Sequence, residues 1–174
     1  AFLDAVPGLA EWAMLGKATY HALRTIGGAP EYDVVVFDAP ATGHGLDVLS
    51  LPTAIANSVP GGRIRDEALE RVALMRDPKR CEVVPVTLPE EMPVSEALEL
   101  VAGLRRRGLP MERIVVNMVR EARVDPALEA FVRGQGDGVE PWLVPAAVAV
   151  GRERAQREAL ARLASGCSLA GIRL

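Results

Sequence analysis

The 174-residue sequence contains few aromatic side chains and few of the residues that bind metals. Aromatic residues make up 4% of the chain, and there are two cysteines and two histidines. Cys81 and Cys167 lie far apart in the sequence and outside any Cys-x-x-Cys or Cys/His spacing, so neither a zinc site nor a disulfide framework is expected. This cysteine usage is typical of a reducing compartment, and we expect a cytoplasmic protein.

The sequence also lacks long apolar runs and a strong net charge. No apolar run reaches the roughly 18 residues of a membrane-spanning helix, so we expect no transmembrane segment. A net charge of −3 argues against a sequence-independent grip on nucleic acid phosphates. The composition is 49% hydrophobic and mainly aliphatic, which is enough for one sizeable core. We therefore expect residues 1–174 to form a single domain.

The most informative stretch runs from Tyr32 to Pro52. Residues 32–37 are β-branched or aromatic apart from one acid, the pattern of a strand buried on both faces in a parallel sheet. Asp38 follows at the carboxyl end of this strand, where ligands bind in open α/β sheets. A loop with one proline and two glycines comes next, and a helix is expected to begin near Leu46.

Asp38 followed by Thr42-Gly43-His44 resembles the Walker B strand and switch II loop of the deviant P-loop ATPases related to the arsenite-pump ATPase ArsA and the Get-pathway targeting ATPases. The resemblance implies that Asp38 holds Mg2+ through water. It also implies that the Thr-Gly-His loop changes conformation with the γ-phosphate of ATP. From the residues alone, Asp38 could equally cap the helix that follows. No carboxylate or cysteine is spaced to join His44, so we expect a mobile switch residue that is neither a metal ligand nor a general base.

A second similar segment is Pro89-Glu90-Glu91-Met92, which follows an expected strand over residues 83–88. The next helix carries acids early and the run Arg105-Arg106-Arg107 late, an order that complements the helix dipole. We interpret the arginine run as a helix C-terminus. Phosphate binding by these arginines is the less favoured alternative.

The third similar segment is a short buried strand over residues 114–116, followed by Asn117 and Met118. The resemblance implies that this segment contacts adenine, with the Asn117 amide supplying a donor and an acceptor to the base. A left-handed turn at Asn117 is the structural alternative. Residues 139–145 resemble the family's last strand, whose closing proline, Pro145 here, lies near the adenine.

Helical periodicity predicts further helices over residues 9–23, 66–77 and 126–134, with Asp125 as the cap of the third, and over about residues 152–164. Gly27-Gly28 is expected to end the first helix, and residues 52–60 to form an irregular connector. No hairpin pattern is found. Four buried strands alternating with helices predict an α/β fold, a doubly wound and mostly parallel sheet with helices on both faces.

One motif of P-loop ATPases is missing: the sequence holds no G-x-x-x-x-G-K-[ST]. The resemblance therefore implies the carboxyl-terminal portion of such an ATPase, with ATP and Mg2+ as cofactors. We expect this chain alone not to hydrolyse ATP, because positioning by the P-loop provides most of phosphoryl-transfer catalysis.

Three functions compete at this stage. The first is the nucleotide-binding portion of an ArsA-like ATPase, a homo- or hetero-dimer that couples ATP binding and hydrolysis to a conformational switch for transport or targeting. Its partner would be a membrane-protein client or a pump. The second is a non-catalytic companion subunit or interaction module of the same fold. The third is an α/β enzyme that uses His44 and Asp47 in acid-base chemistry. Arsenite needs three soft ligands, which two unclustered cysteines do not supply.

Overall fold

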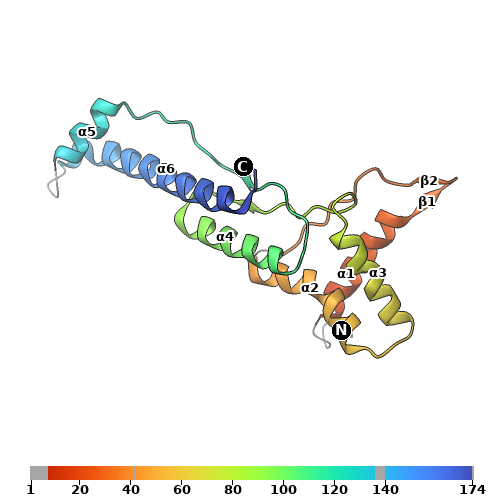
Figure 1. Ribbon diagram of the computed structural model, residues 1–174. Coiled ribbons are helices and arrows are strands. Elements are labelled where there is room, and N and C mark those ends of the chain that lie inside the picture. Colours follow the sequence, from red (N-terminus) through yellow and green to blue (C-terminus); the bar gives the residue numbers. More distant parts are fainter. Residues whose placement is uncertain (1–7, 41, 136–139, 174) are drawn as a thin grey trace. The chain divides into compact units, whose positions relative to one another are not determined.

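The computed structural model describes residues 8–40, 42–135 and 140–173, which fall into two compact units. Unit 1 comprises Ala1–Glu82 and Gly103–Pro110, and unit 2 comprises Val83–Ala102 and Met111–Leu174. The helices are α1 (Leu9–Leu23), α2 (Thr42–Ser58), α3 (Arg63–Arg76), α4 (Glu91–Arg106), α5 (Pro126–Gly134) and α6 (Val144–Ala170), with a 3-10 turn η2 (Pro141–Leu143) (Figure 1). The strands are β1 (Thr25–Ile26), β2 (Ala29–Pro30), β3 (Val86–Thr87) and β4 (Val115–Val116).

In unit 1, α2 packs against both α1 and α3. Val48, Pro52 and Ala56, spaced by four residues, form the buried face of α2, because residues four apart lie on one side of a helix. Arg71 of α3 places its guanidinium carbon 3.8 Å from the centre of the Trp12 ring on α1, a cation-π contact.

The prediction that residues 52–60 form an irregular connector is wrong. Residues 52–58 belong to α2, which begins at Thr42 rather than near Leu46 and continues to Ser58. Pro52 lies inside the helix, and its ring is fully buried. Burial of the ring compensates for the backbone hydrogen bond that a proline cannot donate, which local propensity does not anticipate.

A β-hairpin follows α1, although no hairpin was expected. β1 and β2 pair antiparallel, with Thr25 opposite Pro30 and Ile26 opposite Ala29. Gly27 and Gly28 have φ values of 61° and 88°, as a two-residue type I′ turn requires at both positions. The helix ends at Leu23, and the two glycines form the turn between β1 and β2.

Unit 2 contains a strand-helix-strand unit. β3 and β4 pair in parallel, and α4 is the helix that connects them. Arg173, just after α6, forms a parallel bridge with Arg113 beside β4. One face of α4 packs on α6 and on the strands through a buried cluster. Its members are Val94, Ala97, Val101, Ile114, Ala159, Leu163, Cys167 and Ile172.

The described residues do not confirm a doubly wound sheet, because they form two sheets of two strands each. The strands expected over residues 83–88 and 114–116 are present but shortened to β3 and β4. Residues 141–145 of the expected last strand instead form η2 and the first turn of α6, Glu140 precedes η2, and Val139 lies outside the described residues. Within the described part of the chain, no helix has the length and apolar character to cross a bilayer.

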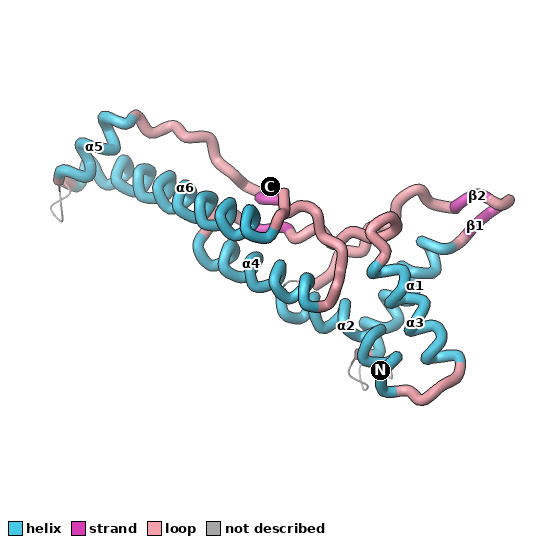
Figure 2. Tube along the Cα trace, in the orientation of Figure 1, coloured by secondary structure: helices cyan, strands magenta, loops and turns pink. Residues whose placement is uncertain are grey.

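The segment between β4 and α5 runs along α6 without forming regular structure (Figure 2). Side chains of α6 hold its backbone: Glu153 accepts from the N–H groups of Arg123 and Val124 at 2.7 and 3.1 Å. Gln156 exchanges two hydrogen bonds with the backbone of Arg120. The connection from β4 to α5 is therefore anchored by polar side chains.

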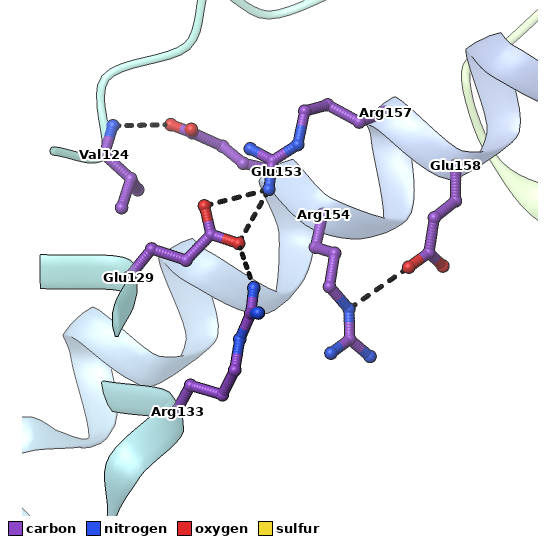
Figure 3. A network of polar contacts seen from close by, with 7 residues as sticks. All are labelled: Val124, Glu129, Arg133, Glu153, Arg154, Arg157 and Glu158. Atoms are coloured by element: carbon purple, nitrogen blue, oxygen red, sulfur yellow. Dashed lines mark hydrogen bonds and ion pairs between the residues drawn. The ribbon is translucent and has the colours of Figure 1, made fainter. Parts of the chain in front are cut away.

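The expected cap of α5 is confirmed. The Asp125 carboxylate accepts from the Ala127 N–H at 2.7 Å, with Pro126 as the first helical residue. Glu129, one turn further, pairs with Arg133 on its own helix and with Arg157 on α6, each at 2.9 Å (Figure 3). The arginine pair converges on one carboxylate and ties α5 to α6.

Replacement of the cap should loosen α5 locally. In Asp125→Ala the Ala127 N–H loses its partner, which costs about 1 kcal/mol. A cost of that size should speed hydrogen exchange of the α5 amides by roughly fivefold. Asp125→Asn is the matched control, because its side chain retains the accepting oxygen. Equal acceleration in both variants would show that the cap contact is not what stabilises α5.

The two cysteines should differ in reactivity. Cys167 is 1% exposed, Cys81 is half-buried, and burial raises the pKa of both thiols. A raised pKa lowers the thiolate fraction at any given pH, and burial also blocks access to the reagent. Alkylation followed by mass spectrometry at pH 8 should therefore label Cys81 first, and in urea both should react alike. Equally fast labelling of Cys167 in the native chain would contradict its burial in the core.

Candidate functional site

The segment that leads to Asp38 is not a strand, contrary to the prediction for residues 32–37. Val34 and Val36 are 76% and 86% exposed, so their side chains are not covered by other described residues. A strand needs backbone partners along its edges, and the described residues provide none at this segment. Asp38 itself is exposed and accepts no hydrogen bond from another described residue.

The loop after Asp38 closes tightly onto α2. The Pro40 carbonyl oxygen lies where a side chain on Gly45 would begin, so only glycine fits there without a shift. Gly43 has open space around it. Thr42 is the first residue of α2, so the Thr-Gly-His sequence forms the first turn of the helix. Since α2 begins four residues after Asp38, the carboxylate is not in the cap position next to the helix.

His44 has a carboxylate neighbour that sequence spacing did not reveal. Its side chain is 59% exposed, and Nε2 lies 3.5 Å from Oε1 of Glu11 on α1. The expectation that no carboxylate joins His44 is therefore wrong. Glu11 precedes His44 by 33 residues, and only the packing of α1 on α2 brings the two together. Among the described residues, no group of three or more His, Cys, Asp or Glu side chains is arranged to hold a metal ion.

Asn117 follows directly after β4, as expected. Its N–H donates to the Thr87 carbonyl at 2.8 Å and continues the parallel pairing with β3. Its side-chain oxygen accepts from the Met118 N–H at 2.9 Å. The left-handed residue is Met118, with φ 57°, so the alternative of a left-handed turn at Asn117 is wrong. Met118 is exposed, and together the two residues present an amide and a thioether beyond the strand end.

Pro145 is not brought next to Asn117. It lies in the first turn of α6, whereas β4 lies beside Arg173, just past the other end of that helix. A helix of 27 residues is roughly 40 Å long at about 1.5 Å per residue. Asp38 belongs to unit 1 and Asn117 to unit 2, and their expected place on one sheet edge stays a prediction.

Comparison with known proteins identifies relatives of this sequence. The family profile described as anion-transporting ATPase matches residues 1–61, which include the loop from Asp38 to Gly45. ATPase BagA of Mycobacterium tuberculosis is 30% identical over 146 residues, covering 82% of this chain and 43% of the relative. ATPase GET3B of Arabidopsis thaliana is 30% identical over 126 residues, covering 52% of this chain and 31% of the relative.

A third relative is the ATPase ASNA1 homolog of Cryptosporidium parvum, 29% identical over 150 residues. The match covers 67% of this chain and 39% of that protein. The chain thus spans less than half the length of the curated relatives it matches. The relatives are all named as ATPases, and together with the family profile they show that the chain belongs, as a partial segment, to the ArsA/Get3-type ATPase family.

Proposed function

We propose that this chain provides the metal-binding acid, the switch loop and part of the adenine contact of an ATPase that couples ATP binding and hydrolysis to a conformational change. The observation that carries the proposal is the loop from Asp38 to Gly45. An exposed acid without a described partner precedes a tight, glycine-dependent turn into a helix, within the residues that match the family profile.

The carboxylate oxygens of Asp38 are of the kind that bind Mg2+. Mg2+ in nucleotide sites is bound by one or two carboxylates, with water and substrate phosphates completing the shell. One accessible carboxylate therefore fits this role, and no cluster of protein ligands is required. When bound, Mg2+ neutralises charge on the β and γ phosphates. In this proposal Asp38 would hold the metal ion through a water molecule.

The turn at residues 42–45 provides the switch. Among the described residues, the His44 side chain pairs with Glu11 alone, in a long contact that contributes about 0 to 1 kcal/mol. Gly43 imposes no side-chain barrier. A contact with the γ-phosphate can therefore replace the contact with Glu11 at little cost in free energy, while Gly45 keeps the turn close to the Pro40 carbonyl.

Asn117 and Met118 form the proposed adenine contact. The hydrogen bond from the Met118 N–H uses one lone pair of the Asn117 side-chain oxygen and fixes the amide plane. The amide NH2 and the second lone pair remain to pair with the base. Met118 contributes a polarizable apolar surface that suits an aromatic ring.

The remaining features of the intact protein are also proposals. They comprise the doubly wound sheet, a dimeric state, a membrane-protein client or pump as partner, and a cytoplasmic location.

The role of Asp38 is tested by Asp38→Asn in the full-length protein that contains this chain. The change is isosteric, so the fold should persist while Mg2+ binding weakens and phosphate release falls by roughly 100-fold or more, as for loss of one transition-state electrostatic contact. Asp66→Asn is the matched control, because Asp66 is an exposed acid on α3, outside the loop from Asp38 to Gly45. Unchanged Mg-dependent phosphate release in Asp38→Asn would refute the metal role.

The phosphate-release assay on the 174-residue chain tests whether these residues alone can catalyse hydrolysis. We expect no phosphate release above background, because the sequence carries no P-loop lysine and no P-loop backbone to stabilise the transferred phosphoryl group. Robust hydrolysis by this chain alone would show that the chemistry resides in other residues.

The adenine contact is tested by Asn117→Ala, with ATP affinity of the full-length protein measured by calorimetry. The Asn117 amide is exposed in this chain, and a bound base would bury it. Loss of its hydrogen bonds to the base should then weaken binding by about 1 to 3 kcal/mol. Asn117→Asp retains the acceptor for the Met118 N–H but lacks the NH2 donor, so it separates the base contact from local structure. Wild-type affinity in both variants would exclude Asn117 from the nucleotide site.

A further inference from the structure

A cavity of about 390 Å³ lies within unit 1, away from the loop at Asp38. Its walls come from the second half of α2, the last turns of α3, and the segment at the end of α4. Residues from all three places belong to the same compact unit. The volume falls in the usual range of sites for small molecules, about 300 to 1,000 Å³.

The charge of the lining has one sign. Arg76 of α3 and Arg106 and Arg107 at the end of α4 border the cavity, and no aspartate or glutamate does. Asp77, next to Arg76 in sequence, uses its carboxylate to accept from the Lys79 N–H at 3.0 Å. Three guanidinium groups without a carboxylate among the lining residues create a positive field that favours an anion.

The three arginines differ in how firmly they are held. The Arg107 Nε donates to Ser50 Oγ at 2.6 Å, and its Nη1 donates to the Gly103 carbonyl at 3.1 Å. These bonds fix the plane of the guanidinium and leave its Nη2 group for a ligand. Arg76 and Arg106 are exposed, and their side chains pair with no other described residue. Arg107 is therefore a pre-organised donor, and Arg76 and Arg106 are two further donors that can turn toward a ligand.

The rest of the lining is largely apolar. Leu49 on α2, Val72 and Met75 on α3, and Leu109 after α4 contribute aliphatic or thioether surface. An inorganic anion would leave this surface in contact with water. A ligand that joins an oxyanion to an aliphatic portion would use both halves of the cavity.

We propose that this cavity is a binding site for a small organic oxyanion with an aliphatic tail, held by Arg76, Arg106 and Arg107 and packed against the apolar wall. The head group is a carboxylate or a phosphate, since both accept paired hydrogen bonds from a guanidinium. The site is independent of the nucleotide role of the chain, because it shares none of the residues proposed for ATP or Mg2+.

The test uses the 174-residue chain and four probes: hexyl phosphate, hexanoate, inorganic phosphate and hexanol. Calorimetry should show one equivalent of a hexyl anion binding more tightly than either inorganic phosphate or hexanol. The tighter of the two hexyl anions identifies the head group, and either result supports the site. Equal affinity for hexanol and the hexyl anions, or no binding by either anion at millimolar concentration, would overturn the proposal.

Matched variants locate the binding. Arg76→Gln with Arg106→Gln removes two exposed charges that stabilise no described contact, so the fold should persist while affinity falls roughly tenfold, as expected for lost charge-assisted hydrogen bonds. Arg152→Gln with Arg162→Gln removes two exposed arginines of α6 in unit 2, the same change in net charge, and should leave affinity unchanged. Equal losses in the two double variants would show attraction by net charge alone and would refute the site. Chemical shift changes confined to α2, α3 and residues 103–110 would support it.

Discussion

The parallel pairing of β3 with β4 is the interaction on which unit 2 depends. The Val115 N–H donates to the Pro85 carbonyl at 2.9 Å, and on the other side the Ile114 N–H donates to the Arg173 carbonyl at the same distance. This central position of β4 determines where α4 crosses and where α6 ends. It also determines where Asn117 leaves the strand, so the proposed base contact is a direct consequence of backbone pairing.

Helices in this chain were largely predictable, because their patterns are local. Apolar spacing located α1, α3 and α4, and the Asp-Pro pair located the start of α5. Strands were less predictable, because a run such as residues 32–37 becomes a strand only when other strands are present to pair with it. The length of α2 was missed for a related reason, since burial of Pro52 outweighs the helix-breaking tendency of proline.

The candidate site shows the same limit. The order of Asp38 and the Thr-Gly-His turn is local in sequence and could be read directly, as could Asn117 after a strand. Glu11 could not be associated with His44, because their contact depends on packing between α1 and α2. Likewise, nothing in the sequence near Met118 predicts the positive backbone φ of this residue, which has a long unbranched side chain. The conformation is strained, and the hydrogen bond from the Met118 N–H to the Asn117 side-chain oxygen helps to offset its cost in free energy.

The segment between β4 and α5 is held to α6 by two side chains, Glu153 and Gln156, which lie one helical turn apart. Backbone pairing in a sheet is cooperative along its length. The hydrogen bonds made by Glu153 and Gln156, in contrast, can break without disturbing the backbone hydrogen bonds of α6 or the buried cluster beside β4. Val124 of the segment adds an apolar contact, because it packs against the cluster of Val132, Leu143 and Val150. We expect this lightly attached segment to open at a lower free energy than the strand that carries the Asn117 amide.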